Sequence, residues 1–233
     1  MYQYVIFDAD HTLLDFNSDE RAAFGRTFSH FGIRFTEEDI HRAWVLSYTV
    51  WDEQGLNNLD SEDIRANFHK KYVSHLPILF SRIKEGLPTD ATAEDMAEIF
   101  LGELNSPAKT LGNALEIFRE CSRSYRTCIA TNGLSVMQRA RLRDFLPHAY
   151  AVFVSEELQA IKPAKEFFDS MFSSLGTSAE KCLFVGDSLS SDIAGANAVG
   201  MDCVWLNRTG KALPSQYAVR GQIDDLDGVW AFL

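Results

Sequence analysis

The stretch YVIFDADHTLL, residues 4–14, decides the fold of this 233-residue chain. The apolar run from Tyr2 to Phe7 predicts a strand that is buried on both faces of a parallel sheet, and the run ends at Asp8. A single strand cannot form a sheet, so this one must pair with strands that come later in the chain. The sequence beyond it therefore has to supply the partner strands.

Residues 16–109 supply no such partner, because their apolar residues recur at helical spacing. Thr36 with Asp39, and Thr92 with Asp95, have the pattern of a helix N-cap followed by an acid in the first turn. Gly32 is typical of the end of a helix. We therefore predict that this block is helical throughout.

From Thr110 onward, helix and strand patterns alternate. Strands are predicted at Arg126–Thr131, Ala151–Val154, Cys182–Val185 and Cys203–Leu206, with helices at Leu111–Ser122, Ser135–Phe145, Ala164–Leu175 and Ser191–Val199. This alternation predicts a doubly wound parallel α/β fold. The first strand must rejoin that sheet, so residues 1–15 and 110–233 are expected to form one core, with residues 16–109 inserted as an all-helical block.

Polar side chains follow the first four of the five predicted strands. They are Asp8, Asp10 and Thr12 after the first, Thr131 and Asn132 after the second, Lys162 beyond the third, and Asp187 and Asp192 after the fourth. Taken singly, each group is ordinary turn or helix-cap chemistry. Ligands in open α/β sheets bind at the carboxyl ends of the strands, so the joint occurrence of these groups indicates an active site.

This residue set is suited to phosphoryl transfer, with Asp8 as the nucleophile. A carboxylate approaching a phosphate dianion meets repulsion of roughly 4 kcal/mol for each charge pair at about 4 Å and a dielectric of about 20. A magnesium ion that is held by Asp8, Asp187 and the main-chain carbonyl of Asp10 would cancel this repulsion. Lys162 supplies a second positive charge against the transferring group.

The remaining groups have supporting roles. Asp10 is expected to protonate the leaving oxygen and later to deprotonate the attacking water. Thr131 and the main-chain N–H groups around Asn132 are expected to bind the phosphoryl oxygens, as Lys162 does. Thr12 is expected to fix the loop after the first strand, and Asp192 to orient Lys162 or a metal-bound water.

These residues resemble the four motifs of the haloacid dehalogenase-like superfamily. FDADHTL at residues 7–13 resembles the first motif, Thr131 the second, Lys162 the third, and GDSLSSD at residues 186–192 the fourth. The resemblance implies a modified Rossmann core with a helical cap inserted after the first strand. The dehalogenase branch lacks the second acid of the first motif, so Asp10 favours a phosphatase. His11 stands where many relatives carry glycine or glutamate, and its side chain is expected to point away from the site.

The inserted block also bears on the substrate. YTVWDEQGLNNLDSEDI at residues 48–64 is similar to the cap of bacterial pyrimidine 5'-nucleotidases of this superfamily, which implies a nucleoside 5'-monophosphate as substrate. A sugar-phosphate phosphatase or a mutase of the β-phosphoglucomutase type would share every core residue and remains an alternative. Trp44, Tyr48 and Trp51 offer flat surfaces for stacking on a base, but their helical spacing is also typical of residues that pack the cap core.

Composition limits the partners. A net charge of −11 disfavours nucleic acid and anionic membranes, and no apolar run is long enough to span a bilayer. The four cysteines have no metal-ligand or redox spacing, so we expect reduced thiols in a cytoplasmic protein that acts on a small phosphorylated metabolite. A signalling receiver domain uses similar acids but would lack the insertion. The sequence leaves monomer and dimer equally open.

Overall fold

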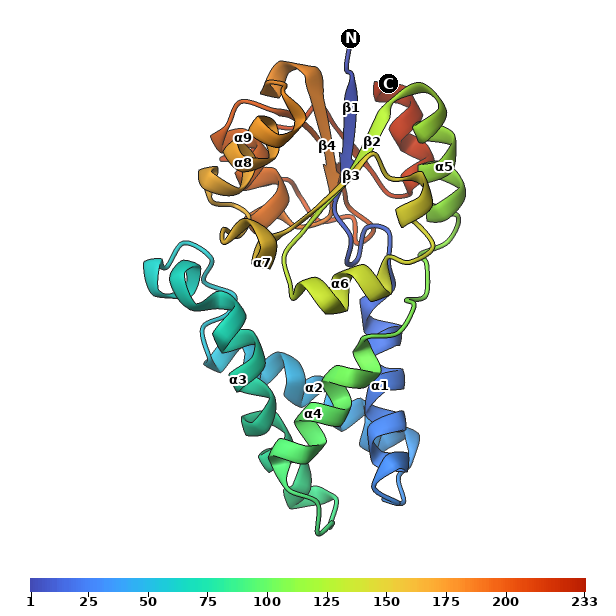
Figure 1. The fold of residues 1–233 in the computed structure, drawn as a ribbon, viewed down its shortest axis with the longest axis vertical. Helices are drawn as coiled ribbons and strands as arrows, with labels where there is room; N and C mark the ends of the chain where they lie inside the picture. Colours follow the sequence, from blue (N-terminus) through green and yellow to red (C-terminus); the bar gives the residue numbers. More distant parts are fainter.

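The computed structural model describes residues 1–233 and shows a six-stranded parallel sheet in the order β3-β2-β1-β4-β5-β6 (Figure 1). The strands are β1 (Tyr4–Phe7), β2 (Arg126–Thr131), β3 (Ala151–Val154), β4 (Cys182–Gly186), β5 (Asp202–Leu206) and β6 (Gly221–Ile223). The strand order reverses at β1, which pairs with β2 on one side and with β4 on the other. The end of β1 is therefore the position at which such a sheet opens a crevice.

Both faces of the sheet are covered. The helices of the core are α5 (Ala114–Ser124), α6 (Ser135–Arg141), α7 (Ser155–Leu158), α8 (Lys165–Leu175) and α9 (Ala194–Ala198). Val5 and Phe7 of β1 belong to the apolar cluster that includes α5, whereas Tyr4 and Ile6 belong to the cluster that includes α8. Because successive side chains of a strand point to opposite faces, an apolar strand is buried on both sides. The predicted doubly wound fold is confirmed.

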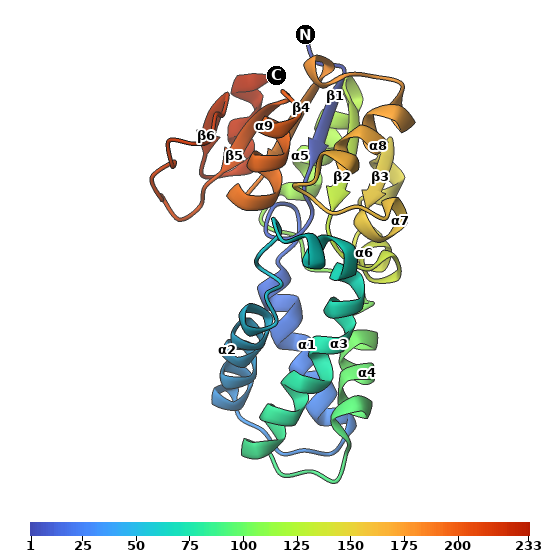
Figure 2. The ribbon, with the colours of Figure 1, turned by 90° about the vertical axis from the view of Figure 1, so that its left-hand side faces the viewer.

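Four helices form an elongated cap at one end of the core (Figure 2). They are α1 (Phe16–His30), α2 (Glu37–Glu53), α3 (Glu62–Gly86) and α4 (Ala93–Leu104). The predicted N-caps are present, since Thr36 and Asp39 form a reciprocal capping box and the Thr92 side chain accepts a hydrogen bond from the Asp95 N–H. The cap has its own apolar core, and this core reaches Met137 of α6, which belongs to the part of the chain that carries the sheet.

The two segments that connect cap and core run side by side. The Asp15 N–H donates to the Lys109 carbonyl at 2.8 Å, and the Leu111 N–H donates to the Leu13 carbonyl at 2.9 Å. The chain thus leaves and re-enters the core at one place, next to the strand end that carries Asp8. The boundaries at residues 15/16 and 109/110 stay predictions.

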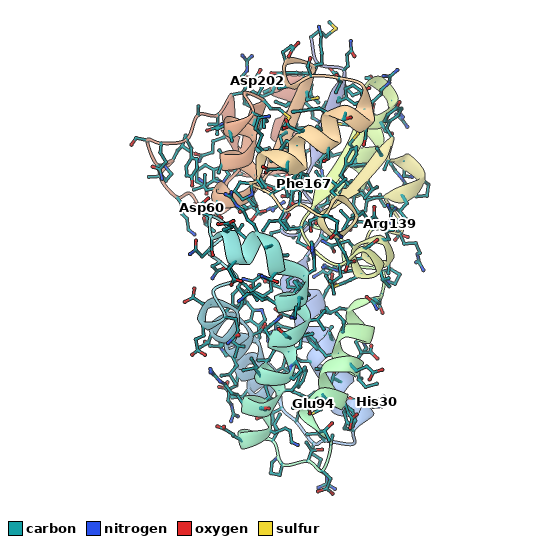
Figure 3. All side chains as sticks on the ribbon, turned by 60° about the vertical axis from the view of Figure 1, so that its left-hand side comes forward. His30, Asp60, Glu94, Arg139, Phe167 and Asp202 are labelled. Atoms are coloured by element: carbon teal, nitrogen blue, oxygen red, sulfur yellow. The ribbon has the colours of Figure 1, made fainter.

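Several short elements were not expected from the sequence. They are α7, β6, the π-helical turn η3 (Leu189–Ile193), and the 3-10 turns η1 (Leu146–His148), η2 (Ala179–Lys181) and η4 (Leu226–Phe232). The turn η3 replaces the first part of the helix that was predicted at Ser191–Val199. None of the helices is both long enough and apolar enough to cross a membrane. Figure 3 shows His30 and Glu94 at the far end of the cap and Asp60 at the end that faces the core.

Candidate active site

The carboxyl ends of the central strands surround a polar cleft of about 290 Å³. Every side chain that lines it is polar or charged: Asp8, Asp10, His11, Thr131, Asn132, Lys162, Asp187, Ser188 and Ser191. These residues come from the ends of β1, β2 and β4 and from the loop between α7 and α8. The structure thus brings together the groups that the sequence placed at separate strand ends.

Lys162 is the positive charge at the floor of this cleft. Its Nζ donates to Asp8 Oδ1 at 2.6 Å, to Asp192 Oδ1 at 2.7 Å and to the Ala130 carbonyl at 2.8 Å. Asn132 holds the Lys162 main chain, because its Oδ1 accepts from the Lys162 N–H at 2.8 Å and its Nδ2 donates to the Lys162 carbonyl at 2.9 Å. The Asn132 side chain is therefore engaged by the protein, which leaves its main chain as the predicted phosphate contact.

Negative charge exceeds positive charge in this cluster. Ligand atoms of Asp8, Asp187 and Asp192 lie within 4.8 Å of one another, so three carboxylates against the one Lys162 ammonium leave two negative charges. Burial raises the pKa of Asp8 well above its usual range, Lys162 opposes this shift, and the neighbouring carboxylates add to it. Burial, followed by the charge of Asp192, raises the pKa of Asp187 to about 7. A divalent cation would balance the excess.

The free oxygens fit a hard cation such as magnesium. Asp187 Oδ2 and the main-chain oxygen of Asp10 receive no hydrogen bond from another residue, and Asp8 Oδ1, which accepts one hydrogen bond from Lys162, has a second lone pair for a metal. Asp192 differs, because its Oδ1 accepts from Lys162 and its Oδ2 accepts from the Ser188 N–H at 3.0 Å. Asp8, Asp10 and Asp187 remain the predicted ligands, and Asp192 is placed to orient Lys162.

Two threonines support neighbouring groups. The Thr12 hydroxyl donates to Asp187 Oδ1 at 3.2 Å, which links the loop after β1 to the loop after β4. Thr131 is almost fully buried, and its Oγ1 accepts from Gln138 Nε2 at 2.6 Å. The Thr12 contact is of the kind predicted for that residue. Thr131 lines the cleft, and its phosphate-binding role stays a prediction.

Asp10 is held by two residues of α6. Gln138 Nε2 donates to Asp10 Oδ2 at 2.8 Å, and Arg141 Nη1 lies 2.8 Å from Asp10 Oδ1 in an ion pair without hydrogen-bond alignment. The buried Arg141 also donates to Asp19 Oδ2 at 3.0 Å and lies over the Phe16 ring at 4.7 Å. Since Asp19 and Phe16 belong to the first turn of α1, Arg141 connects Asp10 to the base of the cap.

Gln138 and Arg141 were not found from the sequence. The signal in the sequence is that they lie three residues apart, next to the apolar Met137 and Leu142, on a helix that starts just after Thr131. Residues at this spacing share one face of a helix. A polar pair on the buried face of a helix beside a strand end is unusual enough to indicate a role in the site.

The glycine before Asp187 makes room for Asp192. A Cβ atom at Gly186 would lie 2.3 Å from Asp192 Oδ2, closer than any real Cβ contact. Any larger residue would displace the carboxylate that holds Lys162. The glycine of the fourth motif is thus explained by a close approach of a side chain to the main chain.

His11 is among the residues that line the polar cleft, and its ring lies 5.9 Å from the Phe16 ring in an edge-to-face contact. The expected direction of its side chain, away from the site, stays a prediction. The main chain at His11 has φ 63°, in the left-handed region that glycine adopts without steric cost. This conformation explains why glycine is common at this position in the family pattern.

A second cavity, of about 310 Å³, extends from the catalytic loop into the cap. Asp10 and Asn132 lie on its core side, and Tyr48, Trp51 and Glu20 lie on its cap side. Trp44 and Trp51 both pack against the cap core, but Trp44 does not line the cavity. The structure therefore separates the three aromatic residues of α2 that the sequence treated alike.

Glu20 is expected to make stability depend on pH. Burial raises the pKa of its carboxyl from 4.5 to about 7, against the hydrogen bond from Ser47 and the charge of Arg141, while Tyr48 and Tyr72 face it as neutral phenols. A carboxyl whose pKa is raised by folding stabilises the folded protein below its unfolded pKa, and this contribution disappears as the pH rises through the folded pKa. Stability should fall between about pH 4.5 and 7 by roughly 3 kcal/mol from this residue.

The check is Glu20→Gln, which cannot ionise. Urea unfolding in EDTA should give the variant a higher free energy of unfolding than the parent at pH 8, with the difference vanishing near pH 4. Glu98→Gln, at an exposed position on α4, is the matched control and should follow the parent. If the free energy of unfolding depended on pH in the same way for Glu20→Gln and the parent, folding would not raise the pKa of the Glu20 carboxyl.

A model of the haloacid dehalogenase-like hydrolases matches residues 2–200 of the chain. The pyrimidine 5'-nucleotidase PynA of Streptococcus pneumoniae is 29% identical over 210 residues, which cover 88% of this chain and 84% of PynA. The pyrimidine 5'-nucleotidase YjjG of Escherichia coli is 26% identical over 231 residues, which cover 97% of this chain and 95% of YjjG.

A solved structure is similar over the whole chain. The HAD-hydrolase YfnB of Bacillus subtilis, crystallised with bound magnesium, has a TM-score of 0.84 and 26% identity, and the match covers 100% of this chain and 98% of YfnB. That crystal form of YfnB reveals interdomain movement. The match includes both the sheet and the helical cap.

Proposed function

This chain belongs to the haloacid dehalogenase-like hydrolase family, and from that premise we propose that it hydrolyses phosphate monoesters through a phosphoryl group carried on Asp8. One observation carries the proposal. Lys162 holds Asp8 Oδ1, while Asp8 Oδ2 receives no hydrogen bond from another residue and Asp8 lines the polar cleft. One oxygen of the carboxylate is thus positioned and the other is available for attack.

The proposed reaction has two steps. Asp8 Oδ2 attacks phosphorus, the bond from phosphorus to the ester oxygen breaks, and Asp10 gives its proton to the leaving alkoxide. Water then attacks the same phosphorus, Asp10 takes a proton from that water, and the acyl-phosphate bond breaks to restore Asp8 and release phosphate. Gln138 and Arg141 keep the Asp10 carboxyl turned toward the cleft in both steps.

Charge decides whether the first step can occur. Lys162 places one positive charge 2.6 Å from Asp8. This single charge cannot balance the two negative charges of a phosphate dianion. Magnesium, when bound by Asp8, Asp187 and the Asp10 carbonyl, supplies two further positive charges against the transferring oxygens. Thr131 and the main chain at Asn132 are the proposed phosphate contacts, and Thr12 and Asp192 position Asp187 and Lys162.

We assign the substrate as a nucleoside 5'-monophosphate. Two relatives that match most of the chain are named as pyrimidine 5'-nucleotidases, which supports this choice. The cavity above Asp10 has aromatic walls, including Tyr48 and Trp51, that suit a flat base. Residues 16–109 are proposed to act as the cap that closes this cavity, with residues 1–15 and 110–233 as the catalytic core.

Magnesium removal is the direct test. Phosphate release from a panel of nucleoside monophosphates and sugar phosphates should require magnesium, should stop in excess EDTA and should return when magnesium is restored. Nucleoside monophosphates should give the highest kcat/KM. Hydrolysis that continues in EDTA would contradict the metal assignment, and a preference for sugar phosphates would contradict the substrate assignment. Melting curves with and without EDTA serve as the control for folding.

A further inference from the structure

The cap cavity contains one carboxyl group that the proposed chemistry does not use. Glu20 lies on α1, is only 5% exposed and lines the cavity. The Ser47 hydroxyl of α2 donates to Glu20 Oε1 at 2.5 Å. No residue of the protein donates to or accepts from Glu20 Oε2, and this atom is not sealed inside the protein. A polar atom is therefore presented to an otherwise largely apolar space.

A structural role does not account for this arrangement. A carboxyl group in an apolar site costs folding free energy unless its polar atoms are paired. The bond to Ser47 pairs only one oxygen, and an apolar side chain in place of Glu20 would join α1 and α2 without that cost. The unpaired oxygen is explained if a ligand with a complementary polar edge occupies the cavity.

The surroundings define the ligand. Tyr48 and Trp51 of α2 and Phe68 of α3 provide flat surfaces in the same cavity, and base–aromatic stacking is worth about 1–3 kcal/mol per base. Asp10 lines the same cavity from the side of the core, so a molecule that contacts Glu20 can carry its reacting phosphate toward the loop after β1. The volume of about 310 Å³ lies at the small end of the usual range for ligand sites, which favours a single ring over a fused pair.

We propose that Glu20, oriented by Ser47, hydrogen-bonds the ring edge of a pyrimidine base in the leaving group and is a specificity-determining residue. This inference rests on the proposed nucleotidase function. A neutral carboxyl offers a donor beside an acceptor, and the N–H and carbonyl edge of a pyrimidine offers the complement. A sugar phosphate, which lacks the base, would leave Glu20 unpaired, and that difference is the source of discrimination.

The test compares uridine 5'-monophosphate with ribose 5-phosphate at pH 6, where the Glu20 carboxyl is mostly neutral. Glu20→Leu should lower the ratio of the two kcat/KM values roughly tenfold to a hundredfold, because the base loses its polar partner. Glu20→Gln keeps a donor and an acceptor and should stay within about threefold of the parent. Glu98→Leu on α4 is the matched control, and melting curves check that each variant is folded.

Binding provides a readout that does not depend on turnover. Uridine should quench part of the tryptophan fluorescence of the metal-free protein, because Trp51 lines the cavity, and Glu20→Leu should raise the Kd for uridine about tenfold or more. If esters are hydrolysed while Glu20→Leu leaves both the kcat/KM ratio and the uridine Kd unchanged, the assignment of Glu20 is wrong and the phosphatase proposal stands. If no ester is hydrolysed while uridine binding still depends on Glu20, the phosphatase proposal fails and the base subsite stands.

Discussion

Replacing Asp8 with asparagine is expected to lower kcat by about four to six orders of magnitude, the loss seen when a covalent nucleophile is removed. Asparagine keeps the shape of the side chain but cannot form the acyl phosphate. The fold should survive, because Lys162 retains its bonds to Asp192 and to the Ala130 carbonyl. The parent should carry the label when its reaction with an ester that is labelled in the phosphoryl group is stopped during turnover. Asp8→Asn should carry no label.

The matched control for this substitution is Asp169→Asn. Asp169 is an exposed carboxylate that accepts from Lys165 Nζ at 2.7 Å, so it is also paired with a lysine but lies away from the cleft. Its replacement should change neither turnover nor labelling. Turnover near the parental level in Asp8→Asn, or label recovered on a different residue, would exclude the covalent mechanism.

Replacing Lys162 with methionine is expected to impair both catalysis and folding. Loss of a positive charge that faces the transferring group should lower kcat by about two to three orders of magnitude. It also leaves Asp8 and Asp192 buried without their shared counterion, which should reduce the free energy of unfolding of the metal-free protein by about 3–5 kcal/mol. Kinetics and urea unfolding in EDTA measure the two effects separately.

A double variant separates the two roles of Lys162. Adding Asp192→Asn to Lys162→Met removes one of the uncompensated charges, so much of the lost stability should return while activity stays low. Lys165→Met, at an exposed position three residues later, should behave like the parent. If Lys162→Met were as stable as the parent, the ion pairs at the floor of the cleft would not contribute to the free energy of unfolding. If it were as active, Lys162 would have no part in catalysis.

The motifs were predictable because they are local. A short apolar run followed by an acid defines β1 with Asp8 and β4 with Asp187 whatever the rest of the chain does, and an apolar run that ends in a polar residue likewise defines β2 with Thr131. The parallel sheet then forces these ends to one edge. Element boundaries were less predictable, as at η3, where the chain forms a π-helical turn before α9 and Asp192 of this turn lies close to Gly186.

Other features were not accessible from local patterns. The strand β6 is only three residues long, Gly221–Ile223, and has no apolar run that would distinguish it from a turn. Trp230 is apolar, yet the residue is 41% exposed, while the neighbouring Val229 is fully buried. On a short 3-10 segment the choice of buried residue depends on the helix that packs beside it, which here is α5.

The amino-acid sequence by itself determined the order of the longer strands and helices and the acids that gather at the strand ends, because these follow from periodicity within short windows. Only the tertiary structure decided which polar side chains are buried together. Arg141 meets Asp10 and Asp19 across more than a hundred residues, and Glu20 faces a cavity that exists only once α1 packs against α2. Such contacts depend on how whole helices pack, so no local pattern encodes them.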